Sequence, residues 1–464
     1  MLSGKRFFFV GIGGSGMMPL AMIVHARGAT VAGSDRGLDQ GRVPAKFAAL
    51  EDLGITLHPQ DGSGIVSAEQ IVVASAAVED SVADIVAATA IDATRMTRAE
   101  LNASLFNAVE QSIGVAGTSG KSTVTGMIGW ILESAGVQPT VMNGAVMKNF
   151  VRPDLPFASA IVGAQRVYVS EVDESDGSIA LYAPDIAVLN NISLDHKSLD
   201  ELRGLFGDFA KKARITIVNI GDAEAAALAT TLDSGRLLTV AVERDADLSA
   251  RNIVEAPFAV SFDLLTNGEV HPVRLAVPGR HNVANALAAL GAACMAGVPL
   301  SEAIAAIADF TGLRRRFELV GEAGGVAVID DFAHNPDKIA ATLSTLHAHP
   351  GRLLILFQPH GYGPLKQVRR ELVATFLTGL TGDDVLVLPD PVYEGGTVAR
   401  EVGSAEIVGD IAIGGGRVLH IPDRMSAAAH LVAQARPGDR IIVMGARDDT
   451  LSLLAAEMVE MLRR

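Results

Sequence analysis

Short apolar runs rich in valine, isoleucine and phenylalanine recur along the whole chain and alternate with longer stretches of helical pattern. Three examples are RFFFVG from residue 6, SIGVAG from residue 112 and RIIVMGA from residue 440. Strands that are buried on both faces of a parallel sheet have this composition, and parallel strands need a crossover between them, usually a helix. The alternation therefore predicts an α/β fold built from repeated strand–helix–strand units.

The pattern restarts at three points, where a strand runs into a glycine turn or an acidic end near residues 11, 117 and 331. A chain of 464 residues is also too long for one ordinary core, because domains average roughly 150 residues. We expect a Rossmann-like domain over residues 1–105, a central doubly wound sheet of the P-loop ATPase type over residues 106–321, and a second Rossmann-like domain over residues 322–464.

The charge and the cysteine content argue against several classes of protein. The net charge of −15 disfavours a nucleic-acid-binding surface, since affinity for a phosphate backbone comes from lysine and arginine. Cys294 is the one cysteine, so no intrachain disulfide can form, as in a reducing compartment. No signal-peptide pattern is found, and no run of about 18 apolar residues could cross a membrane. We expect a cytoplasmic monomer or weak homodimer, without nucleic-acid or membrane partners.

The first glycine cluster has the spacing of a nucleotide-binding turn. Gly11, Gly13 and Gly16 form G-x-G-x-x-G between a predicted strand and a predicted helix, and Asp35 ends the next strand. Such glycines let the backbone approach a pyrophosphate at the start of a helix, and the acid can accept a bond from a ribose hydroxyl. The motif fits an NAD-dependent oxidoreductase or a nucleotide-sugar site, and the glycines could also serve only strand–helix packing.

A second glycine turn, GTSGKST from residue 117, follows the strand that contains Val115. It ends as the phosphate loop G-x-x-x-x-G-K-[ST] does, but Val115 stands where the first glycine of that motif belongs. Backbone amides of such a turn can wrap a β-phosphate, Lys121 would reach the β- and γ-phosphates, and the Ser122 hydroxyl would bind Mg²⁺. We therefore expect ATP and Mg²⁺ here.

Acidic residues follow the next predicted strands. Glu171 and Asp173 are two residues apart and would share one face of a strand, and Asp195 and His196 come after the strand IAVLNN. Carboxylates at the carboxyl end of a strand beside a phosphate loop suit Mg²⁺, which prefers oxygen ligands. The alternatives are a solvated acidic turn and a structural histidine.

Six motifs occur in a fixed order: GTSGKST, EVDESD, NNISLDH, PGRHNVANALAA, RRRFE and DDFAHNP. In this order they resemble the Mur ligase family, and VGIGGSGM and VAGSD resemble the members that act on UDP-N-acetylmuramate. The resemblance covers essentially the whole chain, and the phosphate loop of this family lacks the first glycine, as here. It implies that the first glycine cluster holds the diphosphate of a UDP-sugar.

The chemistry implied by the resemblance is ATP-dependent amide formation in peptidoglycan precursor synthesis. The carboxylate of UDP-N-acetylmuramate, or of a close analogue, forms an acyl phosphate that an amine then attacks. L-alanine is the leading acceptor, and a tripeptide from muropeptide recycling is the second. A site assembled from separate domains would also imply closure around the ligands. A non-catalytic nucleotide-sugar-binding relative is the remaining alternative.

The resemblance also implies the roles of individual residues. The ATP phosphates are expected to contact Gly117, Thr118, Ser119, Gly120, Lys121, Ser122 and Thr123. Other nucleotide contacts are expected at His281, Asn282, Asn285, Arg316, Asp331 and His334. The metal ligands would be Ser122, Glu171 and His196, and the catalytic residues Lys121, Glu171, His196, Arg315 and Arg316. The sugar substrate would contact Gly11, Gly13, Gly14, Ser15, Gly16, Ser34, Asp35, Ser75, His360 and Lys366.

Three positions depart from the family pattern or test it. Ser119 stands where the alanine-adding members have histidine, and Gly361 stands where they have an arginine. Lys366 or Arg369 would have to replace that arginine, or recognition of the acceptor or the sugar acid would differ. Lys211 has the spacing of a lysine that is carbamylated in other members, and we favour an ordinary exposed lysine.

Overall fold

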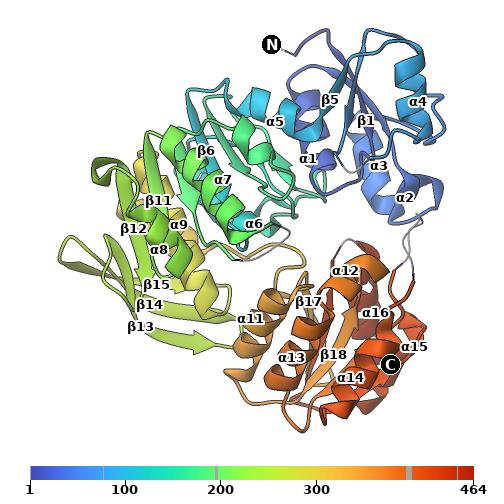
Figure 1. Ribbon diagram of the computed structural model, residues 1–464. Helices are drawn as coiled ribbons and strands as arrows, with labels where there is room; N and C mark the ends of the chain where they lie inside the picture. Colours follow the sequence, from blue (N-terminus) through green and yellow to red (C-terminus); the bar gives the residue numbers. More distant parts are fainter. Residues whose placement is uncertain (1, 77, 194–196, 393–399, 447) are drawn as a thin grey trace. The chain divides into compact units, whose positions relative to one another are not determined.

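The structure is a computed structural model that describes residues 2–76, 78–193, 197–392, 400–446 and 448–464 (Figure 1). The chain forms two compact units. Unit 1 contains residues 1–254, 260–276 and 281–313, and unit 2 contains residues 255–259, 277–280 and 314–464. The boundaries of the three expected domains stay a prediction. No helix in the described ranges combines the length and apolarity needed to cross a bilayer.

The first sheet of unit 1 has five parallel strands in the order β3-β2-β1-β4-β5. The strands are β1 (Arg6–Val10), β2 (Thr30–Ser34), β3 (Thr56–His58), β4 (Gln70–Ala74) and β5 (Arg95–Thr97). The helices are α1 (Met17–Ala26), α2 (Arg36–Asp39), α3 (Pro44–Asp52), α4 (Ala83–Ala90) and α5 (Arg98–Phe106). The strand order reverses beside β1, and α/β proteins bind ligands at the carboxyl end of the strands at such a point. The turn of Gly11–Gly16 lies there.

The second sheet of unit 1 has ten strands in the order β15-β14-β13-β12-β11-β10-β6-β9-β7-β8. The central strands are β6 (Gln111–Ala116), β7 (Thr140–Met142), β9 (Val167–Glu171), β10 (Ile186–Leu189), β11 (Ile215–Asn219) and β12 (Leu237–Val242). The outer strands are β8 (Ala160–Ile161), β13 (Leu248–Ala256), β14 (Ala259–Thr266) and β15 (Glu269–Leu275). Because β6 lies between β9 and β10 and is parallel to both, the carboxyl ends of these three strands meet.

Helices cover this sheet and connect its strands (Figure 1). They are α6 (Lys121–Ser134), α7 (Leu199–Lys212), α8 (Ala223–Ala229), α9 (Arg280–Met295) and α10 (Leu300–Ala308). Three short 3-10 turns are η1 (Lys148–Phe150), η2 (Ser178–Leu181) and η3 (Ser234–Arg236). Ser198 and Glu201 form a capping box at the start of α7. Helix α6 begins directly after the glycine turn that ends in Gly120.

Unit 2 contains a six-stranded sheet in the order β16-β17-β21-β18-β19-β20. Its strands are β16 (Glu318–Ala323), β17 (Val326–Asp331), β18 (Leu353–Gln358), β19 (Val385–Leu388), β20 (Val418–His420) and β21 (Arg440–Gly445). Its helices are α11 (Pro336–His347), α12 (Tyr362–Gln367), α13 (Arg369–Gly379), α14 (Ser404–Ile413), α15 (Arg424–Gln434) and α16 (Thr450–Arg463). Only β16 pairs in the antiparallel direction among these strands. Separate apolar cores lie on the two faces of the sheet, as in a doubly wound fold.

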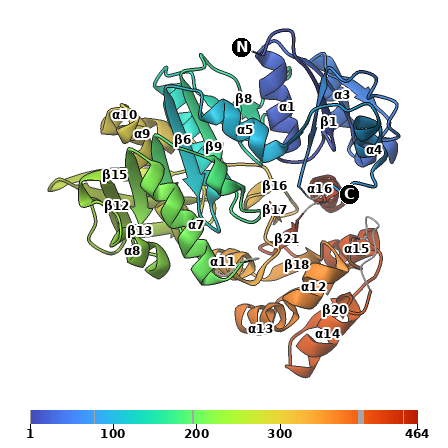
Figure 2. The same cartoon turned by 45° about the horizontal axis from the view of Figure 1, so that its top comes forward.

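A buried polar network joins α5 to β9 within unit 1. The Asn102 amide donates to Ser170 Oγ at 3.0 Å and to the Tyr182 hydroxyl at 2.9 Å. The Tyr168 hydroxyl donates to Asn102 Oδ1 at 2.9 Å. In both views α5 lies between the two sheets (Figures 1 and 2). Since all four side chains are buried and bonded, the network ties the first sheet to the strand that ends in Glu171.

The substitution Asn102→Leu tests this connection. Leucine has a similar size but leaves buried hydroxyls without partners, so we expect a loss of about 2–4 kcal/mol in the free energy of unfolding of unit 1. Calorimetry should show the Tm of the corresponding transition lowered by roughly 4–8 °C. The control is Asn107→Leu, because Asn107 makes its bonds to Leu181 and Ala183 at the exposed end of α5. Equal shifts in the two variants would contradict the role of the network.

Candidate active site

The turn between β6 and α6 needs glycine at two positions. Gly117 has φ 132° and Gly120 has φ 86°, both in the region that glycine favours. A Cβ atom on Gly120 would lie 2.6 Å from Asn190 Nδ2 and 2.6 Å from Asn285 Oδ1. Val115 is buried inside β6, so the missing first glycine lies before the turn begins. The sequence GTSGKST thus forms the strand–turn–helix that a phosphate loop requires.

Asparagines that follow β10, together with asparagines of α9, hold the loop in shape. The Ser119 amide donates to Asn191 Oδ1 at 2.8 Å, and the Asn190 and Asn191 amides donate to the Ser119 carbonyl at 3.1 and 3.0 Å. Asn190 also donates to Asn285 Oδ1 at 2.9 Å, and Asn285 donates to Asn282. These hydrogen bonds fix the shape of the loop. Asn190 and Asn191 were not among the predicted site residues, although they follow β10 at the same end of the sheet as the loop.

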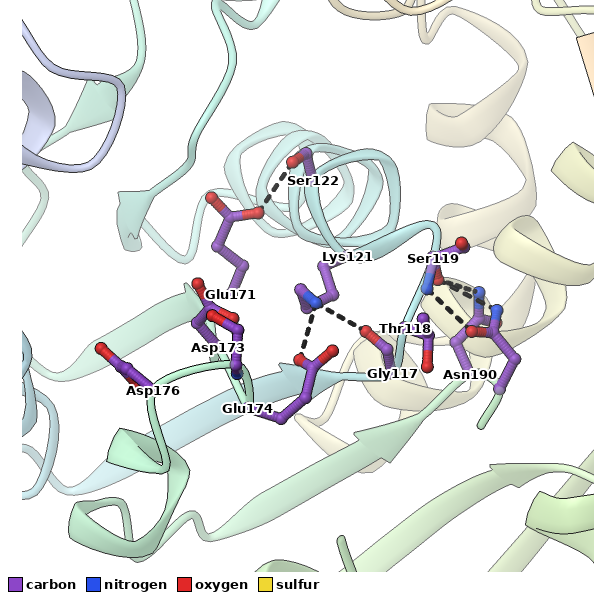
Figure 3. Close-up of polar contacts among 12 residues, drawn as sticks. Gly117, Thr118, Ser119, Lys121, Ser122, Glu171, Asp173, Glu174, Asp176 and Asn190 are labelled. Carbon is purple, nitrogen blue, oxygen red and sulfur yellow. Dashed lines mark hydrogen bonds and ion pairs between the residues drawn. The ribbon is translucent and has the colours of Figure 1, made fainter. Parts of the chain in front are cut away.

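Lys121 lies inside the turn among carboxylates (Figure 3). Its Nζ donates to the Gly117 carbonyl at 2.8 Å and pairs with Glu174 at 2.8 Å. The side chains of Lys121 and Glu174 are only 18% and 6% exposed. Burial lowers the pKa of Lys121, but Glu174, Asp173 and Glu171 together raise it above its ordinary value. Lys121 is therefore charged at neutral pH, and its partner Glu174 was not identified from the sequence.

Ser122 and Glu171 supply two adjacent oxygens. Ser122 Oγ donates to Glu171 Oε2 at 2.7 Å (Figure 3). Octahedral Mg²⁺ with ligands at 2.0–2.1 Å has neighbouring ligand oxygens about 3 Å apart, so this pair fits two ligand positions. The described residues contain no cluster of three His, Cys, Asp or Glu side chains that could hold a metal. The third expected ligand, His196, lies outside the described residues, as does Asp195.

One expectation about this strand is wrong. β9 ends at Glu171, so Asp173 lies in the following turn and does not share a strand face with Glu171. Asp173 instead accepts the Ser175 amide at 3.0 Å, which shapes the turn that carries Glu174. The turn, and not the strand period, brings three carboxylates towards Lys121.

The other central residues are placed as follows. Thr118 Oγ1 exchanges hydrogen bonds with Ser193 at 3.0 and 3.1 Å, and Thr123 lies in the first turn of α6. At the start of α9, Asn282 is buried and His281 is exposed. Lys211 is exposed on the last turn of α7.

The first glycine turn is also pre-shaped. Asp35 accepts the Gly13 amide at 2.8 Å and the Gly37 amide at 2.7 Å, and Lys46 donates to the Gly13 carbonyl at 2.9 Å. Gly14 and Ser15 are exposed at the tip, and Ser75 follows β4. Ser34 Oγ donates to buried Asp84 at 2.5 Å, so Ser34 serves the fold of this sheet. Both Asp35 oxygens therefore shape the turn itself.

In unit 2, Arg315 is a buried residue and Arg316 is more accessible. Arg315 donates to the Gly445 carbonyl at 2.7 Å and lies 3.5 Å from Asp330, whose pKa burial raises to about 6. The Arg316 guanidinium stacks 4.2 Å from the centre of the Phe332 ring and donates to the Arg315 carbonyl. Arg316 is the less buried of the two arginines.

Asp331 and His334 lie beyond β17. Asp331 accepts hydrogen bonds from the Phe317 amide at 3.2 Å and from Thr342 Oγ1 at 2.5 Å. It therefore fixes the backbone next to Arg315 and Arg316. Burial, followed by Lys338, lowers the pKa of His334 to about 3, and its Nδ1 donates to the Phe332 carbonyl at 2.8 Å. His334 is therefore neutral at pH 7.

Lys366 and Arg369 both have acidic partners near Gly361. Lys366 pairs with Glu401, and Arg369 makes a two-pronged contact with Asp410 at 2.6 and 2.9 Å. Gly361, with φ 143°, immediately precedes α12, and His360 packs edge-on against His334 at 5.2 Å between ring centres. Because Lys366 and Arg369 are already paired with acidic residues, neither of them offers an unpaired cation in place of the missing arginine.

Family models and known proteins match this chain over nearly its whole length. The Mur ligase catalytic-domain model matches residues 6–109, the Mur ligase middle-domain model residues 115–293, and the Mur ligase glutamate ligase domain model residues 315–447. UDP-N-acetylmuramate–L-alanine ligase of Streptomyces coelicolor is 34% identical over 461 residues, which are 96% of this chain and 95% of the relative. The enzyme of that name from Acidithiobacillus ferrooxidans is 34% identical over 469 residues, 98% of this chain and 97% of the relative.

Two solved structures have a similar fold. UDP-N-acetylmuramate–alanine ligase from Thermotoga maritima has a TM-score of 0.80 and 24% identity, with 98% of each chain covered. A murein peptide ligase from Psychrobacter arcticus has a TM-score of 0.73 and 24% identity, with 99% of each chain covered. The predicted α/β fold class is confirmed. Since three family models follow one another along the chain and full-length relatives share a third of its residues, the chain belongs to the Mur ligase family.

Proposed function

We propose that this protein is an ATP-dependent ligase that joins L-alanine to the carboxylate of UDP-N-acetylmuramate and releases ADP and phosphate. The observation that carries the proposal is the buried, charged Lys121 in a pre-shaped glycine turn beside Ser122 and Glu171. Such a turn suits a nucleoside triphosphate better than a nicotinamide cofactor. The names of the similar full-length relatives support L-alanine as the acceptor and peptidoglycan precursor synthesis as the setting.

The following roles are proposed for these residues; the contacts of the described ones support them, and His196 is included as the family resemblance implies. The loop amides and Lys121 hold the ATP phosphates, and Lys121 exchanges its contact with Glu174 for the phosphates. Ser122 and Glu171, with His196, would hold Mg²⁺, which would offset phosphate charge when bound. Asn282 and Asn285 fix the loop against α9, and the first glycine turn receives the UDP-sugar. In unit 2 we propose Arg316 and His334 as nucleotide contacts.

A peptide acceptor is the second candidate. Gly361 has no side chain where the alanine-adding members have an arginine, and Lys366 and Arg369 are paired with Glu401 and Asp410. An acceptor larger than one amino acid would fit a site that lacks this arginine. The murein peptide ligase is similar in fold only, so it does not decide between acceptors.

A phosphate-release assay distinguishes these acceptors. With ATP, Mg²⁺ and UDP-N-acetylmuramate, we expect release to require an acceptor and to be fastest with L-alanine, compared with glycine, L-serine and the tripeptide. Mass spectrometry should identify the matching amide product. Release with the tripeptide alone would favour the second candidate. Ligand binding without release under any condition would identify a non-catalytic nucleotide-sugar-binding relative.

Removing the buried cation separates the two ligand sites. Lys121→Ala should lower kcat by at least roughly 100-fold, since a positioned charge at the developing phosphate is lost. The dissociation constant for UDP-N-acetylmuramate should change less than about twofold, because the first glycine turn belongs to another sheet. The matched control is Lys211→Ala, on the exposed end of α7. Loss of sugar binding in Lys121→Ala would contradict the separation, and loss of activity in Lys211→Ala would revive the modified-lysine alternative.

Glu171→Gln tests the metal site. The amide keeps the size of the side chain but removes the charge that a magnesium ligand supplies, so the Mg²⁺ concentration for half-maximal rate should rise about tenfold or more. Direct Mn²⁺ titration followed by electron paramagnetic resonance, with ATP present, should show the same weakening. Glu133→Gln, in the last turn of α6, should match the wild type. An unchanged metal requirement in Glu171→Gln would remove Glu171 from the site.

A further inference from the structure

Arg98 begins helix α5, directly after the short strand β5. A capping box formed by Thr97 and Glu100 holds the start of this helix, and its later turn carries the buried Asn102 network. α5 contacts α1 on one side and β9 on the other. The helix that Arg98 begins therefore packs against both the helix after the first glycine turn and the strand that ends in Glu171.

The Arg98 side chain occupies the space beside Gly16, the last glycine of the first cluster. A Cβ atom on Gly16 would lie 2.9 Å from Arg98 Cδ and 3.0 Å from Arg98 Nη1. Gly16 has an ordinary helical backbone, so no backbone strain calls for glycine at this position. The absence of a Cβ at this position lets the Arg98 guanidinium pass close over the start of α1.

Arg98 makes no hydrogen bond or ion pair to any residue that the structure describes, and its side chain is partly buried. By contrast Arg95, three residues earlier, pairs with Asp80 at 2.9 Å. Acidic residues outnumber basic ones by 53 to 38, so partners are abundant in this chain. No Arg98 nitrogen is among the buried unpaired atoms of the described residues, so the guanidinium reaches solvent and is open to a ligand.

The charge of Arg98 also acts on the acidic turn that follows Glu171. The Arg98 guanidinium interacts electrostatically with the carboxylate of Asp173 in that turn. Arg98 thus lies between the first glycine turn and the turn beside the phosphate loop, within one compact unit. A sugar acid bound at the first turn has to present its carboxylate towards that second turn.

We propose that Arg98 binds the diphosphate of the UDP-sugar acid over Gly16 and so sets the direction in which the sugar leaves the glycine turn. The planar fork of a guanidinium matches two phosphate oxygens, and the start of α1 adds backbone amides for the same anion. This inference rests on the proposed function for the identity of the ligand. It adds a binding residue that the motif comparison did not indicate.

Binding measurements on Arg98→Gln and Arg98→Lys test the proposal, with Arg95→Gln as the matched control. Isothermal titration with UDP, UDP-N-acetylglucosamine and UDP-N-acetylmuramate should show roughly 10- to 100-fold weaker binding of all three to Arg98→Gln. Arg98→Lys keeps the positive charge, so its affinity for the three ligands should fall less than that of Arg98→Gln. Arg95→Gln should bind like the wild type, and the ATP dissociation constant of every variant should stay within about twofold, which also verifies folding.

Two outcomes would overturn the assignment. If the Arg98→Gln variant bound UDP as tightly as the wild type does, the guanidinium would not contact the diphosphate. A loss confined to UDP-N-acetylmuramate would assign Arg98 to the sugar carboxylate instead. If the wild type bound none of the three ligands, the proposed function itself would fail, and the inference with it. The wild-type titration therefore separates the two failures.

Discussion

The burial of one positive charge organises the centre of this protein. An ammonium group withdrawn from water is stable only where carboxylates and carbonyl dipoles replace the lost hydration. Lys121 receives this replacement from Glu174 and from the Gly117 carbonyl, with Glu171 and Asp173 nearby. These contacts keep the lysine charged and keep its turn in shape before a nucleotide arrives. Three carboxylates around one cation also leave excess negative charge, which a divalent ion can offset.

The order of the parallel strands brings the residues of the two glycine turns into position. The carboxyl ends of β9, β6 and β10 lie side by side, and they carry Glu171, the glycine loop and Asn190. In the first sheet the strand order reverses beside β1, and the turn of Gly11–Gly16 lies there. The Asn102 network links α5 to β9, so these two ligand turns belong to one compact unit.

Local patterns predicted buried strands such as β1, β6 and β21 and both glycine turns, because apolar runs and glycine spacing are short-range signals. The same signals indicated acidic residues near the carboxyl end of β9 and placed Ser122 at the start of a helix. Contacts across large separations were not predictable in this way. Glu174 is 53 positions from Lys121, and Asn190 is 95 positions from Asn285. Strand periodicity failed for Asp173 because β9 stops at Glu171, and motif matching could not tell that Arg315 is buried against Asp330.

Oxygen transfer tests the central claim, that the pocket around Lys121 energises a sugar-borne carboxylate with ATP. UDP-N-acetylmuramate labelled with ¹⁸O in both carboxylate oxygens would be incubated with ATP, Mg²⁺ and L-alanine. Phosphorus NMR would then follow the isotope shift of the released phosphate. The account predicts one ¹⁸O atom in each phosphate and one in the new amide. Unlabelled phosphate accompanying amide formation would contradict it.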